Sequence, residues 1–347
     1  GVAGVAVSDG LHVVRTDADG RFALPGAGPF VVLTRPTGHT ADPWFLPAGD
    51  ALEFRLEPVA QPVPFTFAQV TDLHLSLGDT AYGEGQGDAT LWVADGAVHD
   101  RVVTTPAVLA DLLAEVAGHG PAFVVATGDL TNTGSHEELA AYVEEVGRSA
   151  VPVVSVPGNH DHYSAEPPAL PYEEHLGPRW FSFEHGGVHF AAIDWFTWRL
   201  HLDDAQQEAW LAADLSAVPE GTPVVLLTHD QMDSAFFDRL PVRPVASFSG
   251  HWHTTRVVEE AGTVHYNTGT ATFGGLDYSP AHFRLATWDG TSLAVRTVVR
   301  GPEELAGATM RAASAPTGGS QRWAVATEGG AHLSGPVQVG DDHQRIP

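Results

Sequence analysis

Six short apolar runs alternate with helical patterns from residue 65 onward, and this alternation constrains the fold more than any other feature. Most of the runs have no polar interruption, as in strands buried on both faces; they are 65–71, 122–127, 151–156, 188–193, 223–228 and 245–249. Thr105 before Pro106 predicts one helix start, Ser135 with Glu138 predicts a capping box for a second helix, and 202–215 predicts a third. The pattern predicts an α/β domain.

Residues 1–60 have a different character and predict a small all-β domain. The turn Asp9-Gly10 separates two short strands, Phe22 and Leu24 alternate as in another strand, and 52–56 predicts a last one. Residues 17–20 predict a hairpin turn and not a calcium loop, because the remaining calcium ligands are missing. Three prolines between residues 58 and 64 indicate a linker into the next domain.

Two segments have no clear periodicity. Residues 76–103 form a long Gly-rich stretch that is either a lid or binding loop or a mobile surface insertion. Residues 308–320 are small and polar, as in a linker, and 323–339 resemble the start of a blade in a quinone-enzyme-type β-propeller. One blade is not stable alone, so either the chain was trimmed from a longer protein or this tail packs on the main domain.

Composition excludes several classes of function. The formal net charge of -26 disfavours a long nucleic acid as partner, because phosphate-backbone binding needs many basic side chains. The chain has no lysine, which excludes Schiff-base chemistry, and no cysteine, which excludes thiol nucleophiles and thiolate zinc sites. No apolar run reaches the roughly 18 to 20 residues of a membrane span, and we expect that any signal peptide has been removed.

Five of the six apolar runs are followed by residue types that bind metal ions. The carboxyl ends of strands in open α/β sheets line the ligand crevice, so these ends predict one shared pocket. Carboxylate, amide oxygen and imidazole are ligands for Zn, Mn, Fe and related ions. Each motif alone is weak, but five in order predict a metal site; they are Asp72-Leu73-His74, Gly128-Asp129, Gly158-Asn159-His160-Asp161, His229 and Gly250-His251-Trp252-His253.

This ordered set resembles the calcineurin-like metallophosphoesterase superfamily, and the opening residues 4–10 and 14–17 resemble bacterial members with an N-terminal β-sandwich domain. The resemblance implies an α/β (α+β) fold: a four-layer metallophosphoesterase β-sandwich flanked by helices, preceded by a small all-β domain. The implied domains are 1–60 (small β-sandwich), 61–300 (catalytic) and 301–347 (linker and tail). The resemblance also implies a dinuclear centre whose first ion is bound by Asp72, His74 and His253, whose second is bound by Asn159, His229 and His251, and whose bridge is Asp129.

The activity that the resemblance implies is hydrolysis of phosphate esters by a metal-bridging hydroxide, with two divalent or Fe/Mn/Zn-type metal ions as cofactors. His160 is expected to be the general acid, with Asp161 as its orienting partner. Asn132 stands where purple acid phosphatases have a ligating tyrosine, so a tyrosinate-bound ferric ion is not expected. The substrate is expected to be a small phosphodiester or phosphomonoester, and the attached β-modules suggest an extracytoplasmic or secreted protein.

Two alternatives stay open. In one, the protein binds a surface or polymer and the N-terminal β-domain is its main functional part, which an exposed aromatic strip would favour; none is evident in residues 1–60. In the other, the protein is a degenerate enzyme that acts as a scaffold. Intact ligand residues at every motif argue against the scaffold.

Overall fold

The computed structural model describes residues 1–78, 104–163, 169–194, 204–273, 275 and 279–300, together with the backbone of five short strands in the remaining parts. Two of these strands, β8 (Trp92–Ala94) and β9 (Ala97–His99), pair within the predicted lid or insertion; of that segment, residues 76–78 and these two strands are described. The other three form an antiparallel sheet near the carboxyl end, with β20 (Thr309–Ala313), β21 (Ser320–Ala326) and β22 (His332–Gln338). β20 lies inside the stretch that was predicted to be a linker, and the propeller likeness stays a prediction.

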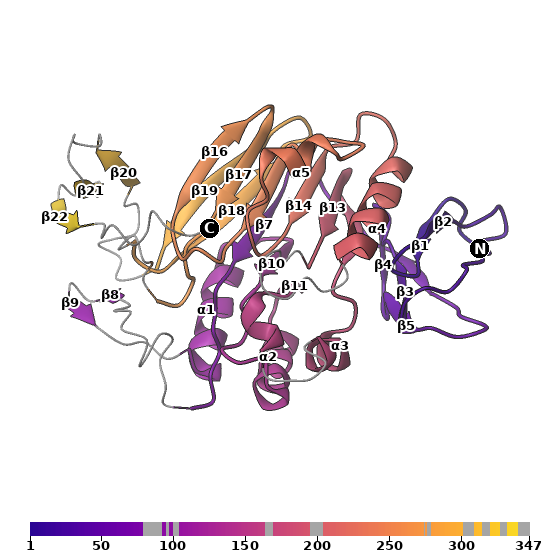
Figure 1. The fold of residues 1–347 in the computed structure, drawn as a ribbon, viewed down its shortest axis with the longest axis horizontal. Coiled ribbons are helices and arrows are strands. Elements are labelled where there is room, and N and C mark those ends of the chain that lie inside the picture. Colours follow the sequence, from indigo (N-terminus) through magenta and orange to yellow (C-terminus); the bar gives the residue numbers. More distant parts are fainter. Residues whose placement is uncertain are drawn as a thin grey trace.

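Two central sheets form the core of the protein (Figure 1). The first has the order β11-β10-β7-β18-β19, with β7 (Phe65–Val70), β10 (Phe123–Thr127), β11 (Val153–Val156), β18 (His282–Trp288) and β19 (Leu293–Val299). The second has the order β12-β13-β14-β15-β17-β16, with β12 (Phe181–His185), β13 (Val188–Ala192), β14 (Val224–Leu227), β15 (Ala246–Ser249), β16 (Arg256–Glu260) and β17 (Thr263–Asn267). All six predicted apolar runs are therefore strands.

Side chains alternate between the two faces of each strand, which explains why the runs are apolar throughout. On β7, Phe65 and Phe67 face the core between the sheets, whereas Ala68 and Val70 face a helical layer. The ring of Phe67 lies 5.4 Å from that of Phe123 and 5.3 Å from that of Phe248, so aromatic residues of both sheets interdigitate there.

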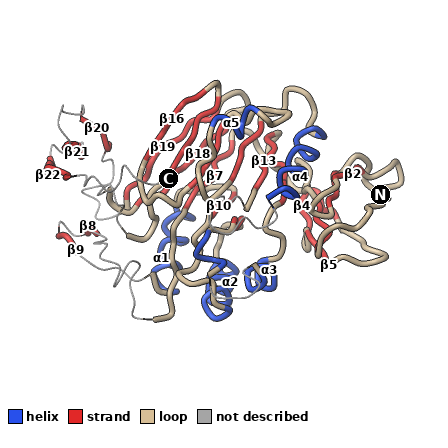
Figure 2. Tube along the Cα trace, in the orientation of Figure 1, coloured by secondary structure: helices blue, strands red, loops and turns tan. Residues whose placement is uncertain are grey.

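Helices cover both outer faces, which gives four layers (Figure 2). The first sheet packs on α1 (Pro106–Gly118), α2 (His136–Arg148) and α3 (Leu170–Leu176), and the second on α4 (Asp204–Ala217) and α5 (Ser234–Asp238). The predicted four-layer architecture is confirmed. None of the helices in the described part of the chain has the length and apolar character that a bilayer crossing requires.

The predicted helix caps are present, with one correction. Thr105 Oγ1 accepts a hydrogen bond from Val108 N, and Ser135 Oγ accepts one from Glu138 N. The carboxylate of Glu138 does not complete the predicted capping box, because its Oε2 accepts hydrogen bonds from the peptide N and the hydroxyl of Thr133 at 2.8 Å. This contact ties the start of α2 to the loop that follows β10.

The N-terminal part is all-β, as predicted. A four-stranded sheet has the order β2-β1-β3-β5, with β1 (Ala6–Ser8), β2 (Val13–Arg15), β3 (Phe30–Leu33) and β5 (Phe45–Pro47); β4 (His39–Ala41) pairs with β6 (Leu56–Pro58). Residues 21–28 and 52–55 form no strand, which corrects two expectations. Phe22, Leu24, Leu52 and Phe54 still pack on this small core, because an extended chain can alternate its side chains without a strand partner.

This all-β part packs beside the second sheet, with its indigo strands next to α4 in Figure 1. Thr34 Oγ1 lies 2.9 Å from Ser182 Oγ, and Ser182 in turn donates to Asp214 Oδ1 at 2.7 Å. Asp214 Oδ2 lies 2.7 Å from His189 Nε2. A buried polar chain therefore connects β3, β12, β13 and α4, and residues 59–64 link the two parts without forming a strand.

Gln69 connects the two central sheets just below their carboxyl ends. Its side chain is fully buried, and its Nε2 donates to Thr127 Oγ1 at 2.9 Å and to the carbonyl of Ser249 at 3.0 Å. Its Oε1 accepts a hydrogen bond from Thr268 Oγ1 at 2.6 Å. One amide thus fixes the ends of β7, β10 and β15 relative to one another.

We predict that Gln69→Leu lowers the free energy of unfolding by about 2 to 4 kcal/mol, because three buried partners lose their hydrogen bonds. Thr66→Val is the matched control on the same strand, where one half-buried hydrogen bond to Thr287 is lost, and should cost about 1 kcal/mol or less. Urea unfolding of both variants gives the comparison. Equal losses in the two variants would contradict the bridging role of Gln69.

Candidate metal centre

Five residues of the predicted site have a left-handed backbone conformation, which side chains other than glycine rarely adopt. The φ angles are 50° at Asp72, 46° at His74, 48° at Asp129, 68° at His251 and 47° at His253. Peptide hydrogen bonds hold the first two strand ends together, because Asp72 N donates to Gly128 O at 3.1 Å and His74 N donates to Asp129 O at 2.9 Å. Such strained backbone is concentrated at functional sites, where the surrounding structure enforces it.

Three motif glycines give these side chains the room they need. A Cβ at Gly158 would overlap the peptide nitrogen and carboxylate of Asp129, and one at Gly250 would overlap the carboxylate of Asp72. A Cβ at Gly128 would overlap the ring of His229. Each glycine therefore lets one strand end approach the next.

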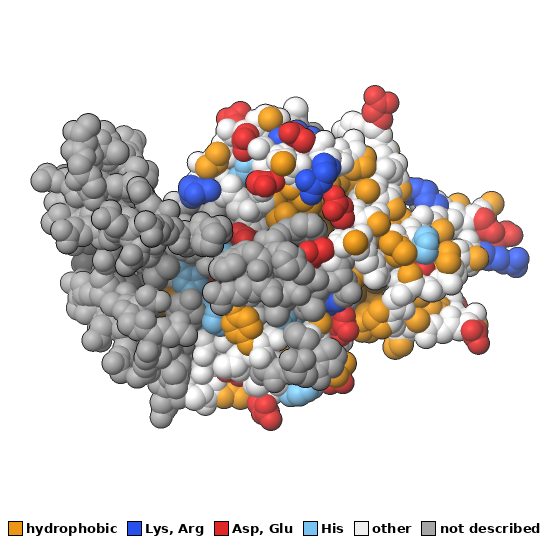
Figure 3. Space-filling model, viewed as in Figure 1, with side chains coloured by type: hydrophobic (Ala, Val, Ile, Leu, Met, Phe, Trp, Pro, Cys, Tyr) orange, Lys and Arg blue, Asp and Glu red, His pale blue; other side chains and the backbone are white. Residues whose placement is uncertain are grey.

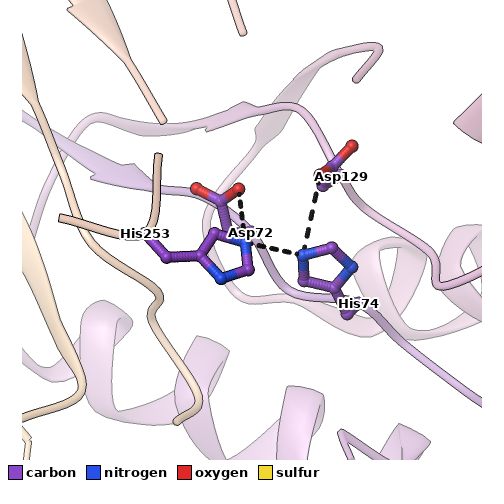
Figure 4. A group of neighbouring side chains, drawn as sticks. All are labelled: Asp72, His74, Asp129 and His253. Atoms are coloured by element: carbon purple, nitrogen blue, oxygen red, sulfur yellow. Dashed lines mark hydrogen bonds and ion pairs between the residues drawn. The ribbon is translucent and has the colours of Figure 1, made fainter. Parts of the chain in front are cut away.

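The first group of converging side chains comes from three strand ends (Figure 4). Ligand atoms of Asp72, His74, Asp129 and His253 all lie within 4.8 Å of one another, and all four residues are buried. His74 Nε2 lies 3.0 Å from His253 Nε2 and 3.6 Å from Asp129 Oδ2. His253 Nε2 lies 3.2 Å from Asp72 Oδ1.

A second group shares one member with the first. Ligand atoms of Asp129, His229 and His251 lie within 4.8 Å of one another, and His229 Nε2 is 3.2 Å from Asp129 Oδ2. Asn159 adjoins this group, since its Oδ1 lies 3.0 Å from His251 Nδ1. The structure thus brings all seven predicted ligand residues together, with Asp129 common to both groups.

The donor set fits two cations. Nδ1 of His229 lies 2.9 Å from the carbonyl of Thr127, which directs Nε2 toward Asp129, an arrangement typical of metal-binding histidines. Burial lowers the pKa of His229, but the charge of Asp129 outweighs it and raises the pKa to about 10. Burial raises the pKa of Asp129, yet the nearby imidazoles hold it well below its usual range. The buried carboxylate of Asp129 therefore attracts positive charge, and the whole cluster matches two divalent metal ions.

His160 has a different orienting partner from the one expected. Its Nδ1 lies 2.7 Å from the backbone carbonyl of Asn132, and its peptide N donates to Asp129 Oδ1 at 2.9 Å. The ring of His160 stands perpendicular to that of His74, with the centroids 4.6 Å apart. His160 therefore lies at the edge of the metal-ligand cluster, and the Asn132 carbonyl fixes its ring.

The side chain of Asp161 binds mainly backbone N–H groups. Its carboxylate accepts hydrogen bonds from Leu130 N, from the peptide N and hydroxyl of Thr131, and from Gly158 N, at 2.7 to 3.1 Å. Burial and the charge of Asp129 raise the pKa of Asp161 above its usual value, although these hydrogen bonds act in the opposite direction. The expectation that Asp161 orients His160 is corrected: Asp161 joins the loop after β10 to the 3₁₀ turn Asn159–His162.

Sequence reasoning missed a buried charge network beside this turn. Asp194 Oδ1 lies 3.2 Å from His162 Nε2, and Asp194 Oδ2 accepts a hydrogen bond from Arg179 at 2.6 Å. Burial raises the pKa of Asp194, but His162 and Arg179 lower it below its usual range. Asp194 follows the fourth apolar run, 188–193, so the strand-end rule that found the other acids could have found this one too.

A comparison with protein families matches the calcineurin-like phosphoesterase model to residues 65–255, which is more than half of the chain and includes both ligand groups. The chain belongs to the calcineurin-like phosphoesterase family. This membership confirms the resemblance and the fold seen in the sequence, and it makes the protein a metal-dependent phosphoester hydrolase in general terms. A search of curated proteins finds no match.

Solved structures of this fold are only distantly similar. The chain is 12% identical to a conserved uncharacterized protein, a predicted phosphoesterase from Streptococcus pneumoniae, with a TM-score of 0.34 over 69% of this chain and 91% of that one. It is 12% identical to a purple acid phosphatase from yellow lupin seeds, with a TM-score of 0.46 over 71% and 54%. It is 14% identical to the phosphopantetheinyl hydrolase of Mycobacterium tuberculosis, with a TM-score of 0.36 over 61% and 90%. Likeness at this level carries no argument about substrate.

We predict that Gly158→Ala lowers the metal content of the purified phosphoesterase by at least about half, because the added methyl group displaces Asp129 from both ligand groups. Gly147→Ala, where a Cβ at the end of α2 meets nothing within 4 Å, is the matched control and should leave the metal content unchanged. Elemental analysis after dialysis measures both. Full metal content in Gly158→Ala would contradict the steric role of this glycine.

Proposed function

We propose that this protein hydrolyses small phosphate esters at a dinuclear metal centre in which Asp72, His74, Asp129 and His253 bind one ion. Asp129, Asn159, His229 and His251 bind the other. The observation that carries the proposal is the shared carboxylate: one oxygen, Asp129 Oδ2, lies 3.6 Å from a ring nitrogen of the first group and 3.2 Å from one of the second. A carboxylate placed between two sets of imidazoles could be shared by two ions, one in each ligand group, which would supply two-metal chemistry.

The ions supply Lewis acidity, which activates water as the nucleophile and neutralises charge on the ester oxygens. The protein holds the ligand residues and His160 in position. Both oxygens of Asp72 accept a hydrogen bond from His251 N, at 3.0 and 3.1 Å, so the first strand end is fixed to the last. Asp161 accepts a hydrogen bond from the backbone next to Asp129, and this contact fixes the loop that carries His160.

His160 is the proposed general acid. Nδ1 lies at the Asn132 carbonyl, and we assign Nε2 as the nitrogen that donates a proton to the departing alkoxide or phenoxide. The hydrogen bond from the peptide N–H of His160 to Asp129 Oδ1 links the position of this acid to the carboxylate that both ligand groups share. His160 is only partly buried, as a group that meets substrate must be.

The proposed substrate is a small ester, either a diester or a monoester. On the face drawn in Figure 3, the basic side chains of the described residues stand among acidic and apolar ones and form no continuous stripe there. Together with the net charge of -26, this disfavours a long nucleic acid. Hydrolysis of bis(4-nitrophenyl) phosphate and 4-nitrophenyl phosphate, each with Mn²⁺, Zn²⁺ and Mg²⁺, separates diesterase from monoesterase action.

The alternative of a surface- or polymer-binding protein gains no support. None of the aromatic side chains in residues 1–60, all of which are described, is exposed; they are Phe22, Phe30, Trp44, Phe45 and Phe54. They pack instead on the small β-core or on the second sheet. An aromatic binding strip is therefore missing from this part of the molecule.

We predict that His160→Ala keeps nearly the full metal content but lowers kcat about 10²-fold to 10⁴-fold, whereas Asp129→Ala empties at least one metal position. The exposed His12→Ala, far from these groups in the sequence, is the control for losing an imidazole. Elemental analysis and kinetics on the same preparations give the answer. Equal metal loss in His160→Ala and Asp129→Ala would refute the separate roles.

A general acid also predicts a dependence on the leaving group. The loss caused by His160→Ala should be smallest for esters of 4-nitrophenol and at least about tenfold larger for esters of phenol, because a poor leaving group needs the proton more. Rates of wild type and variant across a series of aryl esters measure this slope. Parallel slopes would show that His160 does not protonate the leaving group.

A further inference from the structure

A cleft of about 620 Å³ lies at the opposite end of the sheets from the metal centre. Its lining includes the first residues of β7 and β10, Phe65, Thr66 and Phe123, whereas the metal ligands follow the last residues of the same strands. The six residue steps from Thr66 to Asp72 span roughly 20 Å of extended chain, so the cleft is a separate site. Its volume is in the range of small-molecule pockets.

Arg35 is the cationic group of this cleft. Its guanidinium lies over the rings of Phe183 at 5.2 Å and Trp44 at 5.7 Å, which hold it by cation–π contact. Among the described residues, no carboxylate lies within 4.0 Å of this guanidinium and no acceptor makes a hydrogen bond with it. Other arginines of this acidic protein do have a carboxylate partner, namely Arg55, Arg148, Arg179, Arg239, Arg243 and Arg300.

His185 adds a second polar group without a partner. Its Nε2 is buried and, within the described part of the chain, forms no hydrogen bond, while its ring packs 4.6 Å from Phe65 and 5.1 Å from Phe123. Burial and the charge of Arg35 lower the pKa of His185 to about 4, so the imidazole is neutral at pH 7. It can therefore donate to or accept from a ligand without adding charge.

The other polar groups of the cleft do not neutralise Arg35. Glu184 accepts a hydrogen bond from Thr37 N at 3.0 Å, and His39 Nδ1 lies 3.4 Å from the carbonyl of Thr37. The rest of the lining is largely apolar, from the linker and the sheet edge, and includes Val59, Pro62, Pro64 and Val154. A half-buried guanidinium with a free planar edge is costly unless an anion meets it.

We propose that this cleft binds a small monoanion with an aromatic or aliphatic body, whose acidic group pairs with Arg35 and whose body packs on Phe65, Phe123 and the prolines of the linker. The N–H groups of Arg35 can meet a carboxylate, sulfonate or phosphate in bidentate fashion, while both aromatic rings hold the guanidinium in place. The apolar lining selects against free inorganic anions. The site is independent of the proposed hydrolysis.

The test uses the metal-loaded full chain and naphthalene-2-sulfonate, a monoanion that is a poor metal ligand, in calorimetric titration. We expect one saturable site in the wild type, at least about tenfold weaker binding in Arg35→Gln, and unchanged binding in Arg55→Gln, which removes an exposed arginine of the same β-domain. The uncharged 2-naphthalenemethanol should bind at least about tenfold more weakly than the sulfonate.

A second variant keeps the test decisive if Arg35→Gln does not fold. Ala122→Phe enters the cleft from an exposed position and leaves Arg35 in place, so it should also abolish binding. Inorganic phosphate, which we expect to bind at the proposed metal centre, should not displace the sulfonate. Equal affinity in wild type and in the cleft variants, displacement by phosphate, or no saturable binding up to about 10 mM would overturn the proposal.

Discussion

The carboxylate of Asp129 is the contact on which the rest of the site depends. Its Oδ2 faces His74 and His229, its Oδ1 accepts the peptide hydrogen bond of His160, and its backbone carbonyl accepts that of His74. Asp129, a single residue in the loop after β10, therefore sets the distance between the two ligand groups and the position of the proposed acid. Because Asp129 is in a left-handed conformation, this arrangement holds only while the neighbouring strand ends enforce it.

The four-layer fold supplies that enforcement. Parallel strands deliver their carboxyl ends to one edge of each sheet, and Gln69 joins the two sheets by hydrogen bonds directly beneath that edge. Interdigitated aromatic rings around Phe67 leave the sheets little freedom to slide. The core thus fixes the separation of residues that belong to different sheets, such as Asp129 and His229.

The all-β part makes the opposite end of the sandwich different from the metal end. It brings Arg35 over Phe183 of β12 and closes a cleft with the linker, at the first residues of the strands whose last residues lead into the ligands. The same buried interface includes the hydrogen-bonded chain from Thr34 to Asp214. The two ends of one sandwich therefore offer sites of opposite charge preference, one for cations and one for an anion.

The sequence by itself determined six of the core strands and three of the helices in their order, together with the ligand types and the glycines beside them, because these depend on local periodicity and on which residues follow each apolar run. The resemblance named Asp129 as the bridge but not its distances of 3.2 and 3.6 Å from the two imidazole groups, and it paired Asp161 with His160. Only the tertiary structure decided that the Asn132 carbonyl holds His160, that Asp161 holds the loop, and that Arg35 faces a cleft without a carboxylate. The reason is physical: these contacts involve backbone groups or join residues far apart in the chain, and neither leaves a periodic signal in the sequence.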